Sequence, residues 1–302
     1  MRSVVRSLAC LILLAFFPTA EASAGWVIEQ VVRSGGGAAP RPRESDRQVL
    51  TMSANRMKAT MLDGAGKPTA VWIMDLEAQT LTSVDYEHRT VATGTVQEYA
   101  ESMRSATQAM GGQMAEAMKQ MQEAMKDMPP EQRQMMEQMM RKSPPGGAPP
   151  GAAPSAEPCR EPKIEVRPTG QTARIAGFQA ARYDVLEDGM FTQELWVSKD
   201  ITAWREIDPK KLERFTQEMT KALESLPGCG RGRARRMGAD PSDPAWKLAA
   251  EGYPVRTVDH GQRGEVITEV VKAESRTVPV SEFQPPAGFT RQTLKDLMGG
   301  GH

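Results

Sequence analysis

Methionine is the residue type whose spacing in this sequence most suggests chemistry. Of the 20 methionines, 11 lie between Met103 and Met140. Five of them are spaced four, three, four and three residues apart, and two more return in phase. This spacing places them on one stripe of a helix. The stripe consists of Met114, Met118, Met121, Met125, Met128, Met135 and Met139.

Three interpretations of the methionine stripe are open. In the simplest, it packs on a sheet or on a second helix across the turn at Pro129-Pro130. In the second, it forms a pliable surface for a lipid, an acyl chain or an unfolded segment, because unbranched thioethers repack around variable partners. In the third, it captures Cu(I), which thioethers prefer. The stripe contains no cysteine or histidine that would strengthen the metal interpretation.

Cysteine is scarce and suggests one disulfide. Cys10 lies in an apolar leader, which leaves Cys159 and Cys229. In an exported chain two such cysteines are expected to form a disulfide. Closing this loop would stabilise the fold by roughly 4 kcal/mol on the chain-entropy model. A redox or metal-binding thiol pair is the alternative, but no CxxC motif or neighbouring histidine supports it.

Few other residues could take part in catalysis, metal binding or phosphate binding. Of the three histidines, His88 and His260 have no ligand-like neighbours, and the third is the last residue. Four arginines crowd one loop, where they could contact phosphate groups or simply be solvated. These are Arg231, Arg233, Arg235 and Arg236. The sequence contains no nucleophile elbow, phosphate-binding loop, zinc-protease motif or dinucleotide fingerprint. We therefore expect a protein that is not an enzyme and that needs no cofactor.

The charge and the N-terminal segment limit the class of protein. Lysine and arginine number 38, as do aspartate and glutamate, so the formal net charge is zero. A nucleic-acid-binding protein would need a surplus of basic residues, so the zero net charge argues against this class. Arg2 and Arg6 precede the apolar run from Leu8 to Phe17, and small residues end at Ala24. This pattern predicts a signal peptide over residues 1–24, cleaved before Gly25, and a periplasmic location. The apolar run is too short to span a bilayer.

The rest of the chain alternates between strand and helix patterns. Short strands separated by turn residues are expected over 26–33, 47–53, 56–62, 70–76, 80–85 and 89–93, and again over 163–167, 172–175, 179–186, 191–198, 253–258 and 265–278. Thr95 and Glu98 have the spacing of a capping box, which predicts a helix from Val96 to about Met128. Further helices are expected over 131–142, from Asp208-Pro209 to Leu226, and over 243–252. Six prolines and three glycines over 143–158 predict a linker.

Short turns between strands predict an antiparallel sheet and an α+β fold. We expect a large curved antiparallel sheet, an incomplete barrel, with helices packed over one face. The predicted organisation is a single domain over 25–298, with a methionine-rich helical insertion over 95–142, the linker over 143–158 and a disordered tail over 299–302. Two separate halves joined by the linker are the alternative.

Several phrases in the second half resemble a known family. They are Ile175-Ala176-Gly177-Phe178-Gln179-Ala180, Glu194-Leu195-Trp196-Val197-Ser198-Lys199-Asp200, Gly252-Tyr253-Pro254-Val255 and the run from Val278 to Phe289. Together they resemble the exported bacterial proteins grouped as domain of unknown function 4412, best from Lys163 to Met298. These proteins look similar to periplasmic lipoprotein carriers, whose fold is an incomplete antiparallel barrel around helices with an apolar cavity. The resemblance transfers no catalytic residue, because the family carries no established activity.

The resulting hypothesis is a periplasmic, non-catalytic carrier that shelters an apolar ligand, lipid or peptide between sheet and helices. Its partners would be an apolar ligand, a lipid or lipoprotein, or another envelope protein. Nucleic acid is not expected as a partner, and neither is a membrane span after signal cleavage. A methionine-rich Cu(I)-binding protein and an envelope assembly protein whose helices pair with another chain are the alternatives.

Overall fold

The computed structural model describes residues 22–35, 46–126, 163–224, 248, 251–261 and 264–298. Within them, twelve strands form one sheet. In chain order the strands are β1 (Ala22–Gly35), β2 (Asp46–Ser53), β3 (Arg56–Leu62), β4 (Pro68–Asp75), β5 (Thr80–Asp85), β6 (Thr90–Thr95), β7 (Ile164–Ile175), β8 (Phe178–Glu187), β9 (Met190–Ser198), β10 (Tyr253–Gly261), β11 (Gly264–Pro279) and β12 (Thr290–Gln292). The helices are α1 (Val96–Lys126), α3 (Pro209–Glu224) and α6 (Leu294–Met298), with 3-10 turns η1 (Ala203–Glu206) and η2 (Val280–Phe283).

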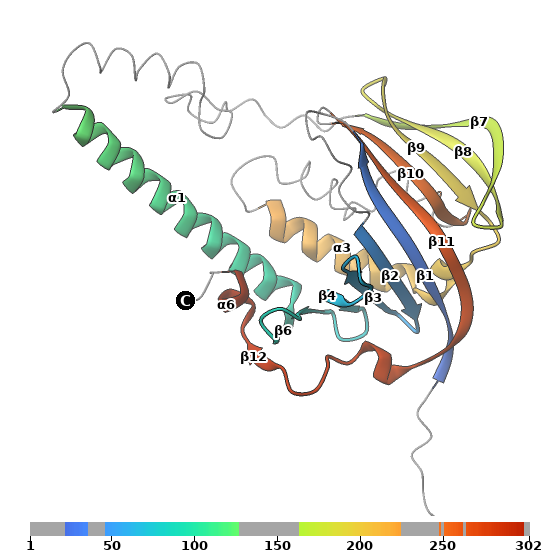
Figure 1. Ribbon diagram of the computed structural model, residues 1–302, viewed down its shortest axis with the longest axis horizontal. Coiled ribbons are helices and arrows are strands. Elements are labelled where there is room, and N and C mark those ends of the chain that lie inside the picture. The colour runs from blue at the N-terminus through green and yellow to red at the C-terminus, as the bar shows by residue number, and fades with distance from the viewer. Residues whose placement is uncertain are drawn as a thin grey trace, which may run out of the picture.

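The sheet is long, curved and open. Its strand order is β12-β6-β5-β4-β3-β2-β1-β11-β10-β9-β8-β7, so β1 lies in the middle, between β2 and β11. Figure 1 shows the sheet curving around α3, with α1 on the same side. The predictions of an α+β fold, a large curved sheet and helices over one face are confirmed.

The prediction that the whole sheet is antiparallel is wrong at one edge. Residues 290–292 of β12 run parallel to residues 90–92 of β6. β12 has this direction because the segment between β11 and β12 first packs on the sheet. Phe283 and Phe289 contact the apolar cluster that contains Val71 and Val84. The chain then meets β6 from the outside, and α6 follows at once. The sequence patterns had indicated neither β12 nor α6.

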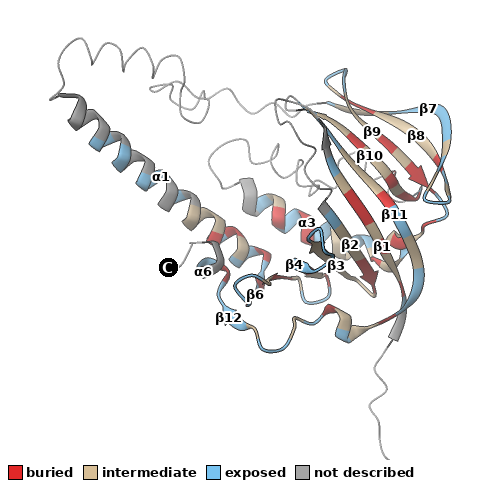
Figure 2. Ribbon diagram, in the orientation of Figure 1, coloured by how far each residue is buried: buried red, intermediate tan, exposed pale blue. Residues whose placement is uncertain are grey.

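The helix side of the sheet carries the main core. Phe215 of α3 is 2% exposed and belongs to one buried cluster with Ile28 of β1 and Met52 of β2. The first turns of α1 join this cluster through Val96, while Tyr99 packs against it. Figure 2 shows burial concentrated in the strands, in α3 and at the start of α1, whose outer part extends away from the sheet.

Both long helices begin where their capping residues predict. In the capping box of α1, the backbone N–H of Glu98 donates to Thr95 Oγ1 at 3.2 Å, and the N–H of Thr95 donates to Glu98 Oε2 at 2.7 Å. At the start of α3, Asp208 Oδ1 accepts from the N–H of Lys210 at 2.8 Å. These bonds satisfy amides that a helix start leaves free.

Asn55 connects the β2–β3 turn to the start of α3. It has a φ of 63°, a conformation that asparagine tolerates better than most residues. Its side-chain oxygen accepts from the N–H of Asp208 at 2.6 Å, and its own N–H donates to the carbonyl of Glu206 at 2.9 Å. The turn therefore fixes the point at which the chain enters α3.

Some predicted elements differ or lie outside the described residues. The strands expected over 163–167 and 172–175 are one strand, β7, whose register with β8 shifts between Pro168 and Thr172. The expected helix over 131–142 and linker over 143–158 are not among the described residues, so the methionine-rich insertion is described only as far as Lys126. No helix in the described ranges has both the length and the apolar character that spanning a membrane requires.

Candidate functional site

The residues that the sequence marked as candidates lie mostly beyond the described part of the chain. Met114, Met118, Met121 and Met125 are on the outer part of α1, but the placement of their side chains is not described. Cys159 and Cys229, and with them the predicted disulfide, are outside the described residues. The same holds for Met128, Met135 and Met139. All these assignments stay predictions. Over the described residues, His, Cys, Asp and Glu form no group able to hold a metal ion.

The centre of the space between sheet and helices is filled by side chains. Ile28 and Met52 from the sheet have no exposed surface, and Ile201 from the segment before η1 is equally buried. A hydrogen bond of 2.9 Å from Gln30 Nε2 to the hydroxyl of Tyr253 crosses this core. The ring of Tyr253 stacks on Trp204, and burial raises the pKa of its phenol. A ligand would therefore have to bind beside this core.

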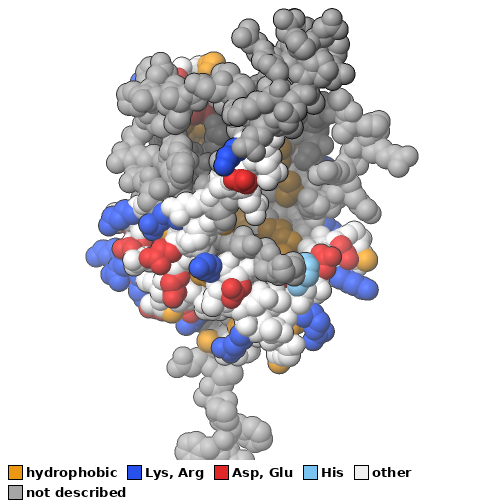
Figure 3. All heavy atoms as spheres, turned by 90° about the vertical axis from the view of Figure 1, so that its left-hand side faces the viewer, with side chains coloured by type: hydrophobic (Ala, Val, Ile, Leu, Met, Phe, Trp, Pro, Cys, Tyr) orange, Lys and Arg blue, Asp and Glu red, His pale blue; other side chains and the backbone are white. Residues whose placement is uncertain are grey.

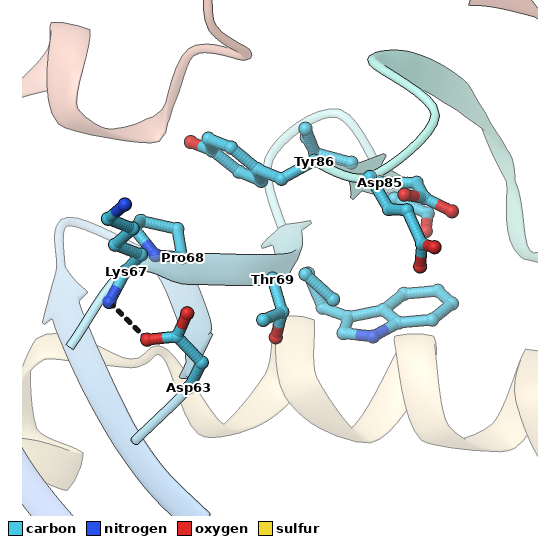
Figure 4. Close-up of a pocket in the computed structure, with 11 residues that line it drawn as sticks. Asp63, Lys67, Pro68, Thr69, Asp85 and Tyr86 are labelled. Atoms are coloured by element: carbon cyan, nitrogen blue, oxygen red, sulfur yellow. Dashed lines mark hydrogen bonds between the residues drawn. The ribbon is translucent and has the colours of Figure 1, made fainter. Parts of the chain in front are cut away.

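An open pocket of about 620 Å³ lies beside the core, where β4 begins and β5 ends. This volume falls within the range of small-molecule sites, roughly 300 to 1,000 Å³. Figure 4 shows Asp63 and Lys67 at one end of the pocket and Asp85 at the other, with Thr69 between them. The lining residues are Asp63, Lys67, Pro68, Thr69, Ala70, Trp72, Ser83, Val84, Asp85, Tyr86 and Glu87. We refer to this feature as the β4–β5 pocket.

Trp72 presents an apolar surface to the β4–β5 pocket. Residues along a strand alternate between faces, so Trp72 shares its face with Met74, which packs against the helix-side core. Its direct cross-strand neighbours are Ala59 on β3 and Ser83 on β5. Small neighbours on both sides leave the indole 37% exposed, although it lies inside a sheet. Figure 3 shows hydrophobic side chains deep in the middle of the face seen from the left of Figure 1.

Ser83 adds a polar group to the same wall. It is only 6% exposed and stands opposite Trp72, so the two side chains share a face. Its hydroxyl makes no hydrogen bond to another residue in the described part of the chain, and its oxygen is not fully enclosed, so it is open to the pocket. A hydroxyl can both donate and accept, so Ser83 can bind a polar group placed in the pocket.

Two aspartates shape the turns at the rim. Asp63 Oδ1 accepts from the N–H groups of Ala65 and Lys67, at 2.9 and 2.8 Å. Asp85 accepts from the N–H of His88 at 3.0 Å and lies 2.8 Å from its Nδ1. The backbone bond and the imidazole contact hold the pKa of Asp85 below its usual range. Asp85 therefore stays ionised at neutral pH.

Replacing Asp85 tests whether its carboxylate pairs with His88 at the rim. The hydrogen bond and charge of Asp85 raise the pKa of His88 above its usual value. Asp85→Asn should lower the pKa of His88 toward that value, because the carboxylate that stabilises the imidazolium is gone. An NMR pH titration of the His88 ring measures this shift. Glu87→Gln is the control and should change the titration much less. Equal effects of the two variants would contradict the pairing.

The far part of the sheet carries a second group of charges. Arg182 lies 2.9 Å from Asp184 and 3.5 Å from Glu194, while His260 lies 3.6 Å from Glu194 and 3.2 Å from Glu265. Arg182 and Asp184 lie on β8, and the other three residues lie on the next strands, β9, β10 and β11. Such cross-strand pairs stabilise a sheet, so we assign them a structural role.

Sequence patterns had indicated neither Trp72 nor Ser83. The available signal was the alternation of β4, in which Ala70, Trp72 and Met74 share one face while Val71 and Ile73 share the other. This alternation places Trp72 on the same face of the sheet as Ala70 and Met74. It does not show that Ala59 and Ser83 are its neighbours, because that depends on the strand register.

Comparison with solved structures finds similar chains at low identity. An uncharacterized conserved protein from Thermus thermophilus is 9% identical, with a TM-score of 0.38, over 90% of this chain and 91% of that one. PNGF-II is 9% identical with a TM-score of 0.35, over 92% of this chain and 33% of its own. A chain of the Pseudomonas aeruginosa MucA/MucB complex is 10% identical with a TM-score of 0.33, over 87% and 56%. This chain thus spans a third of PNGF-II and just over half of the MucA/MucB chain.

No curated protein matches the sequence. One family model matches, and it covers residues 232–289. This segment contains two of the phrases on which the resemblance rests, Gly252-Tyr253-Pro254-Val255 and the run from Val278 to Phe289. Tyr253 pairs with Ser198, so the first phrase lies directly against the phrase that begins at Glu194. Over residues 232–289 this chain matches the family described as Domain of unknown function (DUF4412), and the resemblance to that family is confirmed.

Proposed function

We propose that this protein is a periplasmic, non-catalytic binding protein that holds an apolar ligand, a lipid or acyl chain, in the β4–β5 pocket. The observation that carries the proposal is the half-exposed indole of Trp72 on the helix-facing side of the sheet. The apolar leader supports export.

The site lies at the margin of the helix-side core. The core itself is filled, so a ligand that entered between α3 and β1 would have to displace residues such as Phe215. At the β4–β5 pocket, no such displacement is needed, because Trp72 and Ala70 already form an accessible wall. Apolar burial against this wall would supply the driving force, at about 25 cal/mol per Å².

Replacing Trp72 tests the proposal. Trp72→Ala should weaken binding of an apolar dye by about tenfold, because about 60 Å² of lost indole contact corresponds to roughly 1.5 kcal/mol. Dye fluorescence measures the affinity, and native mass spectrometry of protein produced with export identifies any lipid that co-purifies. The matched control is Val271→Ala, which removes an exposed apolar side chain of β11 away from the pocket.

Two results would contradict the proposal. One is the absence of both a co-purifying lipid and a saturable dye site. The other is an equal loss of dye affinity in Trp72→Ala and Val271→Ala, which would show that the dye binds exposed apolar surface in general.

A further inference from the structure

The β4–β5 pocket combines an aromatic face, the hydroxyl of Ser83 and an excess of carboxylates. Three carboxylates line it, from Asp63, Asp85 and Glu87, against one ammonium, that of Lys67. His88 offsets part of the charge of Asp85. The other nearby cation, Arg89, turns elsewhere, since its guanidinium lies 5.2 Å from the ring of Phe289. Glu87 is exposed and belongs to no ion pair in the described part of the chain.

These features favour one ligand chemistry. An ammonium group is attracted to carboxylates, while the face of an indole offers contact area to an apolar body. The ammonium also donates hydrogen bonds, which the unpaired hydroxyl of Ser83 can accept. We infer that the β4–β5 pocket selects an amphiphile with a primary ammonium head group, its apolar body against Trp72 and its ammonium between Ser83 and the rim carboxylates of Asp85 and Glu87. This inference rests on the proposed function and specifies the ligand class for the same site.

The same carboxylates predict weaker binding of a neutral or anionic amphiphile. The carboxylates of Asp63 and Asp85 are held in place by their turns, so they cannot move away from an anionic head group. A neutral head group gains nothing from them. Because the rim is exposed, salt screens these charges, and the preference for a cation should decrease as ionic strength rises.

Three amphiphiles with the same ten-carbon chain test the inference: decylammonium, decanol and decanoate. The affinity of each is measured by its displacement of an apolar dye. We expect decylammonium to bind about threefold more tightly than decanol, because the attraction of one or two exposed carboxylates is reduced by solvent and salt. Decanoate should bind more weakly than decanol. Raising the salt concentration should bring the three affinities together.

Isosteric variants locate the preference. Glu87→Gln and Asp85→Asn should each reduce the ratio of the affinity for decylammonium to the affinity for decanol. Asparagine keeps an oxygen that can accept from the N–H of His88, so the turn should persist. The control Glu218→Gln removes the same charge from the exposed side of α3 and should change nothing. Circular dichroism confirms that each variant is folded.

The possible outcomes separate the inference from the proposed function. If none of the probes displaces the dye, both fail. If decanol and decylammonium bind equally, or decanoate binds best, the apolar site stands and the ammonium assignment is overturned. The ammonium assignment is also overturned if both pocket variants keep the preference for decylammonium. It is overturned too if trilysine binds as tightly as decylammonium, because the site would then take a basic peptide.

Discussion

Replacing Phe215 by alanine is expected to lower the free energy of unfolding by roughly 3–5 kcal/mol. The ring is 2% exposed and belongs to the cluster that joins α3 to β1 and β2. Its removal leaves a cavity that the surrounding strands cannot close, because they are fixed by ladders on both sides. Urea denaturation followed by far-UV circular dichroism measures the change.

The neighbouring position supplies the control for this prediction. Arg214 is exposed on the same helix, and Arg214→Ala should change the stability by no more than about 0.5 kcal/mol. Phe215→Leu, which keeps most of the apolar volume, should cost far less than alanine. If Phe215→Ala and Arg214→Ala had similar effects, the ring could not be a core residue, and α3 would not be packed as described.

A single methyl group at Gly252 is expected to be almost as damaging. A Cβ at this position would lie 2.2 Å from the carbonyl oxygen of Ser198 and 2.7 Å from its carbonyl carbon. Both atoms belong to the backbone, so the clash cannot be relieved by a rotamer change. We expect Gly252→Ala to destabilise the fold by roughly 2–4 kcal/mol, measured by the same denaturation.

Gly261 is the matched control for Gly252, because Gly252 directly precedes β10 and Gly261 is its last residue. A Cβ there would meet only the carbonyl oxygen of Gly264, at 3.5 Å, an ordinary contact. Gly261→Ala should therefore be nearly neutral. A neutral Gly252→Ala would mean that Gly252 is not seated against β9 as described. The close approach also gives a physical reason for the glycine in the phrase Gly252-Tyr253-Pro254-Val255.

The fold class and the local features could be predicted from the sequence, and the order of the strands in the sheet could not. The bounds of β3 and β5 match the prediction to the residue, because turn residues such as Asn55 and Asp63-Gly64 delimit the strands. The starts of α1 and α3 also match, because their caps are local. The sheet order is different in kind. No local pattern shows that β1 pairs with β11, or that β12 returns to β6.

The candidate site was less predictable for the same reason. The methionine stripe was visible because its members are close in sequence. The β4–β5 pocket joins the β3–β4 turn, the indole of Trp72 and the hydroxyl of Ser83 through strand register. None of these residues is unusual alone. The exposed indole becomes notable only when Ala59 and Ser83 are known to flank it, since larger neighbours would have covered it.

The position of β1 also bears on how the protein folds. From Gly25, after the predicted cleavage point, to Gly35, β1 pairs with β11 between Arg276 and Glu265, and this ladder alone joins β2–β6 to β7–β10 in the sheet. One edge of β1 therefore stays unpaired until β11, near the end of the chain, is available. Such long-range pairing slows folding and leaves an edge open to aggregation in the interval. A chaperone that shields β1 would be expected to increase the yield of folded protein more than one that acts on the local hairpins.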